Sequence, residues 1–470
     1  MIINGILADK YQENAIRTSG NILLIAGAGA GKTFTIIGKI NYLIETLKIK
    51  PTNILVISFT NKSVNDLKNK IKYDVDIYTF HKLALSILES NNIEYKLASS
   101  DYLLFITNEF FLSLTDLELM NKICKYYDCY NYDSFLHSYY FNELVTLIVT
   151  FINIYKTNNF LIDEFKKIYR INSFLTSLIL IIYTIYKNDL ESSNLMDFDD
   201  IIINATKNVD GYKNYSYIIV DEFQDTSVIR WNLINELRKK SHAYIFAVGD
   251  DYQSIYHFSG CDINIFLNFN KLIEDSQVLK LVNTYRNSQE LISISSNFIM
   301  KNNSQIKKVL ISNKHLSKPI KYIGYFNLFK KFYFENLLGT LINKYKDILV
   351  LGRNNNDILD VISKNMKYSD NIIYYKDREI KYLTVHSAKG LEADVVIIIN
   401  LNNGKYGFPN KIINNKLIEE IYPTDTSFLY AEERRLFYVA LTRSRNEVYL
   451  FYNFNNTSEF VKEIKKTTFK

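Results

Sequence analysis

The sequence contains little cysteine, proline or tryptophan. Among its 470 residues are three cysteines, four prolines and one tryptophan. Cys124, Cys129 and Cys261 form no C-x-x-C pair and no even-numbered set, which argues against a disulfide framework and against structural zinc. The six histidines are scattered along the chain. The sequence therefore predicts a protein of a reducing compartment that folds without disulfides or structural zinc.

Long apolar runs are also missing. The most apolar stretch, FLTSLILIIYTIY at 174–186, contains serine and threonine and is shorter than the roughly 20 residues of a membrane-spanning helix. The N-terminus lacks the charged start and apolar segment of a secretory signal. We therefore expect a soluble cytoplasmic protein without a membrane partner, in which 174–186 is a buried helix.

Length and charge set broader bounds. A chain of 470 residues with 47% hydrophobic residues is too long for one ordinary core and predicts about two to four domains. The net charge of +6 permits a polyanionic partner without requiring one. Tyrosine and phenylalanine are frequent along the whole chain, so aromatic content alone is no evidence for base stacking.

Strand and helix patterns alternate in two parts of the chain. One part lies before 86 and resumes after 194, and the other starts near 276. Such alternation predicts parallel sheets covered by helices. Between 86 and 194 the apolar residues follow the period of long helices. The patterns predict three units: an α/β lobe of 1–85 with 195–272, a helical insertion of 86–194, and a second α/β lobe of 273–470.

The stretch NILLIAGAGAGKTFTII at 21–37 nearly matches the phosphate-binding loop G-x-x-x-x-G-K-[ST]. An apolar strand precedes it and a helical period follows it. The glycines let the backbone fold around an anion at a helix N-terminus, while Lys32 supplies a cation and Thr33 a magnesium ligand. Ala26 occupies the first glycine position, and a plain strand-to-helix turn is the alternative. The lysine and threonine in register favour the nucleotide site.

Further charged and polar groups follow apolar strands downstream. In IIVDEFQD, Asp221 is placed to hold magnesium and Glu222 to polarise the attacking water. Gln253 in VGDDYQS can sense a γ-phosphate. Arg286 in TYRNS and Arg443 in VALTRSR act as arginine fingers if the second lobe packs against the first. Otherwise each is a structural arginine in a surface ion pair.

Together these blocks resemble the superfamily 1 DNA helicases of the UvrD/Rep/PcrA type, in order and over nearly the whole chain. VGDDYQSIYHFSG, TYRNS, VHSAKGLEAD and AEERRLFYVALTRSR are most similar to the helicase IV branch. In that family A-G-A-G-x-G-K-T is a usual form of the phosphate loop, so Ala26 is a family trait.

The resemblance implies ATP and Mg²⁺ as cofactors and a role for each matching residue. Gln12 reads the adenine edge, although LADKYQ has L-A where the family has L-N and one extra residue before the glutamine. Tyr285 stacks on adenine, Glu222 is the general base, and Thr33 and Asp221 hold the metal. The implied catalytic residues are Lys32, Asp221, Glu222, Gln253, Arg286 and Arg443. The implied nucleotide-binding residues are Gln12, Ala26, Gly27, Ala28, Gly29, Ala30, Gly31, Lys32, Thr33, Phe34, Tyr285, Arg286 and Glu392.

The resemblance also implies a track for single-stranded DNA or a partial duplex. Aromatic faces accept any base at about 1–3 kcal/mol per stack, so the track binds without sequence preference. Core packing is the alternative for Phe59 and Phe198. Repair or replication proteins are further candidate partners. The implied DNA-binding residues are Phe59, Asn61, Thr79, His81, Phe198, Tyr256 and Phe258.

Two departures from the family pattern bear on function. Phe34 stands where UvrD relatives often carry a basic residue, so we expect one phosphate contact fewer. Only residues 354–383 lie between Arg353 and Thr384. UvrD and Rep insert a large helical 2B domain in this interval. Because that domain gates duplex engagement in those relatives, its absence affects strand separation more than translocation.

The expected fold is α/β, with two RecA-like parallel-sheet P-loop NTPase lobes, a helical 1B insertion and no sizeable 2B domain. The implied function is an ATP-dependent DNA helicase that moves 3′ to 5′ on single-stranded DNA, in repair, recombination or replication. One alternative is a translocase that removes bound proteins with little unwinding. Another is the motor subunit of a nuclease complex, which needs a partner because the chain ends soon after its last motif. A non-catalytic binding module conflicts with the presence of Lys32, Asp221, Glu222 and Arg443.

Overall fold

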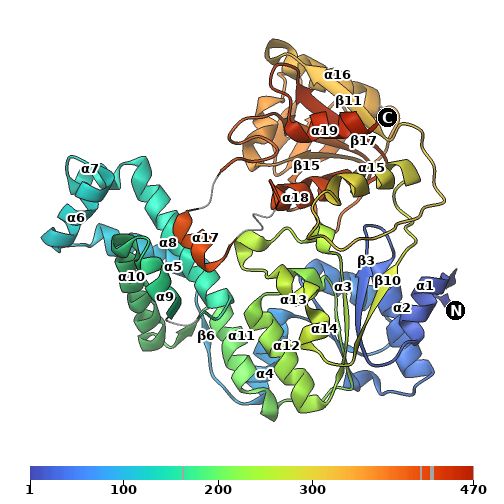
Figure 1. Ribbon diagram of the computed structural model, residues 1–470, viewed down its shortest axis with the longest axis horizontal. Helices are drawn as coiled ribbons and strands as arrows, with labels where there is room; N and C mark the ends of the chain where they lie inside the picture. Colours follow the sequence, from blue (N-terminus) through green and yellow to red (C-terminus); the bar gives the residue numbers. More distant parts are fainter. Residues whose placement is uncertain (161–162, 413–414, 424–427, 469–470) are drawn as a thin grey trace.

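Two α/β lobes and a helical insertion make up the computed structural model, which describes residues 1–160, 163–412, 415–423 and 428–468. In Figure 1 the first lobe lies below, the second lobe above, and the insertion to the left. The α/β class with parallel sheets, predicted from the alternation of patterns, is confirmed.

The first sheet is parallel throughout, and its four inner strands are short apolar runs buried on both faces, as is typical of parallel sheets. Successive residues of one strand point to opposite faces, so Ile22 and Leu24 pack under one set of helices and Leu23 and Ile25 under the other. The strand order is β10 (Ser276–Leu281), β3 (Asn21–Ala26), β9 (Tyr244–Gly249), β8 (Tyr217–Val220), β4 (Ile54–Ser58), β5 (Asp76–Thr79). One face carries α1 (Lys10–Arg17), α2 (Lys32–Glu45) and α3 (Asn61–Lys70), and the other α4 (Phe80–Ser90), α11 (Phe198–Lys207), α12 (Val228–Ser241), α13 (Ile263–Leu267) and α14 (Phe269–Leu272).

The predicted boundary at 272/273, with a second unit starting near 276, is wrong. Strand β10 pairs with β3 in the first sheet, from Ser276 opposite Asn21 to Leu281 opposite Ala26. Parallel pairing joins residues far apart in sequence, so the local pattern at 276–281 could not reveal its partner. The chain crosses to the second lobe only after Leu281, and α15 (Gln289–Ile299) packs in the core of that lobe.

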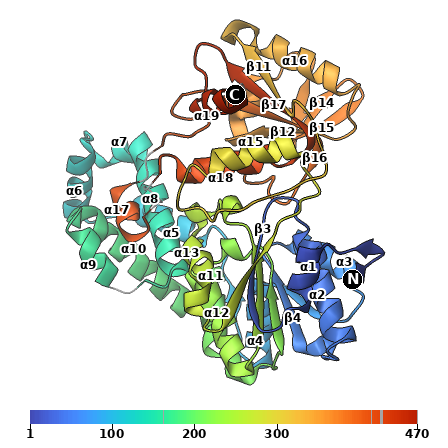
Figure 2. The same ribbon diagram turned by 45° about the vertical axis from the view of Figure 1, so that its right-hand side comes forward.

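The second sheet is parallel except for a hairpin at one edge. Its strand order is β11 (Ile320–Tyr325), β17 (Ser444–Asn453), β16 (Ala393–Leu401), β12 (Ile348–Gly352), β15 (Arg378–Thr384), β14 (Ile372–Tyr375), β13 (Lys367–Ser369). Helices α15, α18 (Ala431–Leu441) and α19 (Glu459–Thr468) cover one face, and α16 (Lys330–Leu341) the other. Figure 2 shows α15 and α18 between this sheet and the first lobe. Residues 354–383 form η7 (Asn355–Asp360), the β13–β14 hairpin and most of β15, so they complete this sheet.

The helical insertion packs around its own apolar core. Asp116, Asn131, Ser138 and Asn172 cap the N-termini of four of its helices through side-chain oxygens. Residues 174–186 lie in α10, which buries one face, and none of the helices in the described part of the chain could span a bilayer. The helices are α5 (Tyr102–Leu112), α6 (Leu117–Tyr127), α7 (Tyr132–Leu136), α8 (Tyr139–Thr157), α9 (Asp163–Tyr169) and α10 (Ser173–Ser192). A short ladder of β6 (Lys96–Leu97) and β7 (Leu195–Met196) lies at their base.

The remaining elements are short. One of them, α17 (Lys416–Ile421), comes from the second lobe but lies against the insertion. The others are β1 (Ile2–Ile3), β2 (Ile6–Leu7), η1 (Pro51–Asn53), η2 (Val209–Gly211), η3 (Phe223–Asp225), η4 (Asp251–Gln253), η5 (His257–Ser259) and η6 (Asn327–Phe329).

Candidate active site between the two lobes

The phosphate loop connects β3 to α2 and depends on two glycines. Gly29 and Gly31 adopt positive φ values of 71° and 84°, which side chains rarely tolerate. A Cβ on Gly29 would lie 2.5 Å from the Cβ of Arg286, and one on Gly31 would lie 2.7 Å from Nε2 of Gln12. The first turn of α2 offers backbone N–H groups without intrahelical acceptors. The loop therefore has the backbone shape and the donors to hold an anion.

The side chain of Lys32, at the end of the loop, lies beside two carboxylates. The ammonium nitrogen of Lys32 is 2.5 Å from Oε2 of Glu222. Burial alone would lower the pKa of Lys32, but Glu222, Asp221 and Asp250 raise it above its usual value. Burial also works against ionisation of Glu222, yet Lys32 and Lys389 hold its pKa below the usual range. At neutral pH Lys32 is therefore cationic and Glu222 is ionised.

Asp221 differs from its neighbour Glu222. Burial, together with the adjacent charge of Glu222, raises the pKa of Asp221. Its carboxylate and the hydroxyl of Thr33 are hard oxygen donors of the kind that magnesium prefers. The donor set at the end of β8 and the start of α2 thus fits a magnesium ion.

Two arginines from beyond the first lobe reach the same place. Arg443 is 1% exposed, and its guanidinium donates to Oε1 of Gln253 in the first lobe at 2.8 Å. Arg286 lies on the connection between the lobes and pairs with Glu392 at 2.7 Å. Burial, with the nearby charge of Arg286, lowers the pKa of Arg443. The lobe packing that the arginine-finger interpretation requires is therefore present.

A cavity of about 840 Å³ lies between these groups. Lys314 and Arg445 also line it, and the sequence analysis missed both; Arg445 is the second arginine of the TRSR block, whereas Lys314 lies in no motif. The predicted residues that line it are Gly29, Ala30, Gly31, Lys32, Thr33, Phe34, Asp221, Glu222, Gln253, Tyr285, Arg286, Glu392 and Arg443.

Four predicted nucleotide-binding residues do not line this cavity: Gln12, Ala26, Gly27 and Ala28. Ala26 ends β3 in the core, and Gly27 faces the side chain of Leu310. The Gln12 side chain is buried behind the loop, where its amide nitrogen donates to the Ala30 carbonyl at 3.3 Å. The adenine-reading role of Gln12 stays a prediction.

Tyr285 stands at the mouth of the cavity. Its ring is 60% exposed, its hydroxyl donates to Oδ2 of Asp9 at 2.6 Å, and its backbone N–H donates to the Gly29 carbonyl at 3.0 Å. These bonds fix an open aromatic face beside the phosphate loop, which suits a stacking partner for a flat base.

The predicted DNA-binding residues of the first lobe cluster at the carboxyl edge of its sheet. Phe59 follows β4 and packs edge-on against Phe80, with ring centroids 5.2 Å apart, so it is partly a core residue. His81 meets Phe198 at 5.2 Å, and Phe198 is 40% exposed. Burial, with the charge of Arg230, lowers the pKa of His81 to about 4, so its ring is neutral at neutral pH. Thr79 caps the N-terminus of α4, and Asn61 is exposed at the start of α3.

Tyr256 and Phe258 form a second aromatic group, at the lobe interface. Phe258 is 58% exposed, and its ring centroid lies 5.3 Å from that of His386 in the second lobe. The Tyr256 hydroxyl donates to the His386 carbonyl at 3.1 Å. The ring of Phe258 is thus open to solvent on one side and held between the lobes on the other.

Sequence reasoning missed two basic residues that lie near these aromatic side chains. Lys389 of the second lobe forms an ion pair with Asp225 and donates to the Gln253 carbonyl at 2.6 Å. It lies in VHSAKGLEAD, so the block itself was a signal. The guanidinium of Arg230 lies 5.3 Å from the centre of the Phe59 ring. No pattern in the sequence indicated Arg230.

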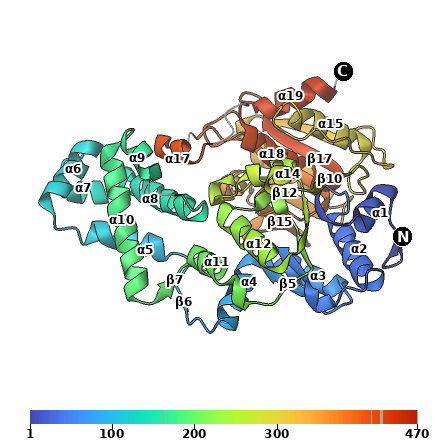
Figure 3. The ribbon, with the colours of Figure 1, turned by 60° about the horizontal axis from the view of Figure 1, so that its bottom comes forward.

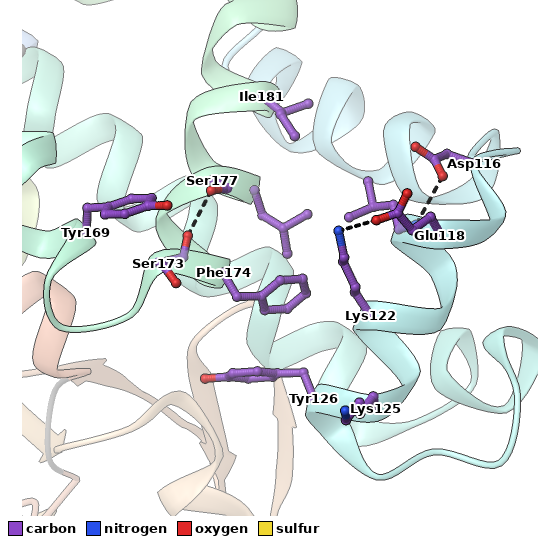
Figure 4. A pocket seen from close by; sticks show the side chains of 12 residues that line it. Asp116, Glu118, Lys122, Lys125, Tyr126, Tyr169, Ser173, Phe174, Ser177 and Ile181 are labelled. Carbon is purple, nitrogen blue, oxygen red and sulfur yellow. Dashed lines mark hydrogen bonds and ion pairs between the residues drawn. The ribbon is translucent and has the colours of Figure 1, made fainter.

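A separate hollow of about 750 Å³ lies in the helical insertion, where Tyr126, Phe174 and the Lys122–Glu118 ion pair form part of its wall (Figure 4). It contains no arrangement of groups comparable to that around Lys32, and we assign it no function.

Comparison with known proteins identifies two family models in this chain. Residues 8–274 match the UvrD/REP helicase N-terminal domain, and 365–455 match the UvrD-like helicase C-terminal domain. DNA helicase IV of Escherichia coli (strain K12) is 27% identical over 95% of this chain and 68% of its own length. ATP-dependent DNA helicase Rep of Buchnera aphidicola subsp. Schizaphis graminum is 31% identical over 79% of this chain and 58% of its own. ATP-dependent DNA helicase PcrA of Leuconostoc citreum is 26% identical over 78% and 50%. The chain thus spans between half and about two thirds of the length of these relatives.

Proposed function

The chain belongs to the UvrD/Rep family of DNA helicases, and from this premise we propose that it is an ATP-driven motor that moves 3′ to 5′ on single-stranded DNA. One observation carries the proposal: Lys32 and Glu222 of the first lobe and Arg443 of the second line one cavity. A cleft whose walls belong to two lobes closes around a ligand that contacts both, which converts binding into movement. The direction, and a role in repair, recombination or replication, rest on the family resemblance.

The residues around the cavity suit phosphoryl transfer to water. Lys32, Arg286 and Arg443 bring positive charge to the place where negative charge develops on the transferred group. Glu222, ionised at neutral pH, is placed to accept the proton of the attacking water. Thr33 and Asp221 would hold Mg²⁺, which neutralises phosphate charge when bound.

Strand separation depends on a region in which this chain departs from the family pattern. Residues 354–383 complete the second sheet, in the place where the sequence analysis expected 2B-bearing relatives to insert a domain. This observation favours a second candidate function, a translocase that removes bound proteins with little unwinding. Unwinding assays on duplexes of increasing length separate the two functions, and a pull-down that recovers a nuclease would indicate a motor subunit instead.

We expect single-stranded DNA to stimulate ATP hydrolysis. Because phosphate contacts and ring stacking would supply the binding, the affinity should fall as salt rises and hardly change with base sequence. ATPase titrations with randomised oligonucleotides at several salt concentrations measure both effects. A strong preference for one short sequence would contradict the aromatic track, and hydrolysis indifferent to DNA would contradict the motor.

Phe258→Ala should weaken DNA binding and impair translocation more than hydrolysis. The loss of one stack, worth about 1–3 kcal/mol, lowers the affinity by roughly 5- to 150-fold. At saturating DNA the ATPase rate should persist, while translocation falls further because each cycle loses its grip on a base. The control is Phe332→Ala, which removes an exposed phenylalanine from α16 on the outer face of the second lobe. A proportionate fall in melting temperature, ATPase and translocation would mean that Phe258 is a core residue.

A further inference from the structure

Helix α17 belongs to the second lobe by sequence but to the insertion by packing. It lies between β16 and α18 along the chain, yet Leu417 and Ile421 are buried in the core of the insertion. Figures 1 and 3 show α17 beside α8, away from the strands of its own lobe. The segment 415–423 therefore packs as part of the helical insertion, although it lies among the elements of the second lobe in the sequence.

Tyr422 directly follows α17 and contacts the turn that carries Phe258. Its ring is buried and lies parallel to the imidazole of His257, with centroids 4.0 Å apart and planes 10° apart. Its hydroxyl donates to the carbonyl of Cys261. His257 begins η5 and Cys261 follows the turn. Tyr422 therefore contacts the imidazole of His257 on one side of Phe258 and the backbone carbonyl of Cys261 on the other.

The insertion holds the same turn from another side. Gly260 ends the turn with φ of +82°, and a Cβ there would lie 2.6 Å from Cγ2 of Thr157, the last residue of α8. The backbone of the turn therefore fits closely between α8 and Tyr422. Burial, with the nearby charge of Arg435, lowers the pKa of His257 to about 4, so both stacked rings are neutral at neutral pH.

We propose that Tyr422 is a positioning residue that holds the His257–Ser259 turn, and with it the Phe258 ring, against the helical insertion. The inference rests on the proposed motor function and adds a connection to it. Because α17 is packed in the core of the insertion, Tyr422 fixes the position of the Phe258 ring relative to that unit, and a loosened ring should hold a base less well.

Two substitutions test this role, since they remove different parts of the contact. Tyr422→Phe keeps the ring and removes the hydroxyl, whereas Tyr422→Leu removes the ring as well. Tyr130→Leu is the matched control, because Tyr130 is almost fully exposed on the insertion. For each variant and the parent protein we would measure melting temperature, ATPase without DNA, the DNA concentration for half-maximal stimulation, and nucleotides travelled per ATP.

In Tyr422→Leu the DNA concentration for half-maximal stimulation should rise by about 2- to 13-fold, the range expected for the loss of one aromatic pair. The distance travelled per ATP should fall, while ATPase without DNA stays close to that of the parent. In Tyr422→Phe both quantities should lie between those of the parent and those of Tyr422→Leu. Tyr130→Leu should match the parent in both.

Parental DNA affinity and parental travel per ATP in both Tyr422 variants would overturn the inference. So would a proportionate loss of melting temperature, DNA-free ATPase and travel, which indicates a purely structural role. If Tyr422→Leu does not fold, the result with Tyr422→Phe decides. A parent protein whose ATPase ignores single-stranded DNA would instead overturn the proposed function, and this inference with it.

Discussion

Lys32→Ala should abolish ATP hydrolysis while leaving the fold intact. The substitution removes the cation of the phosphate loop itself, and the loss of one such preorganised group costs on the order of 10² to 10³ in rate or more. The fold should survive because Glu222 still accepts from Nε2 of Gln224 at 2.8 Å and still has the charge of Lys389 nearby. Steady-state ATPase with saturating DNA measures the effect, and thermal melting checks the fold.

The matched control for this substitution is Lys68→Ala, which removes an exposed lysine from the last turn of α3. We expect that variant to hydrolyse ATP at the parental rate. Unchanged DNA-stimulated turnover in Lys32→Ala would overturn the assignment of the nucleotide site.

Arg443→Ala should leave ATP binding largely in place and slow hydrolysis by about 10³ to 10⁵, the range measured for arginine fingers. Arg443 contacts Gln253 across the lobe interface, so its positive charge is close to the place where negative charge builds up. Arg443→Lys should also be slow, because an ammonium lacks the planar guanidinium fork. ATP affinity from nucleotide titration and single-turnover hydrolysis separate binding from chemistry.

Two measurements keep this result interpretable. Arg443 is buried, so a melting curve must show that the variant is folded. Arg238→Ala on α12 removes a partly buried arginine outside the cavity and should leave the rate unchanged. If Arg443→Ala slows hydrolysis only a few-fold, Arg443 has a structural role.

Features encoded in short stretches were predicted well from the sequence. The strand before the phosphate loop and the helix after it follow from an apolar run, glycines and a helical period within 21–47. The family resemblance, carried by contiguous blocks, is confirmed by the matching family models. Both depend on neighbouring residues, which a sequence displays directly.

Other contacts between distant residues were not predicted. The partner of β10 is β3, more than two hundred residues earlier, and no local signal distinguishes that pairing from the start of a new sheet. The packing of α17 on the insertion is of the same kind, since its apolar residues would suit many surfaces. Gln12 is another example: its role was assigned by resemblance to the family, and nothing in the sequence indicated that its buried amide donates to the Ala30 carbonyl.

The pairing of β10 with β3 also bears on the order in which the chain folds. Strand β3 carries the phosphate loop, and both of its neighbours, β9 and β10, come later in the chain. During synthesis from the N-terminus, β3 therefore has unpaired backbone groups along both edges until 244–281 has emerged from the ribosome. Exposed apolar edges of this kind attract other chains. The strand at the centre of catalysis is thus among the first made and the last to be enclosed.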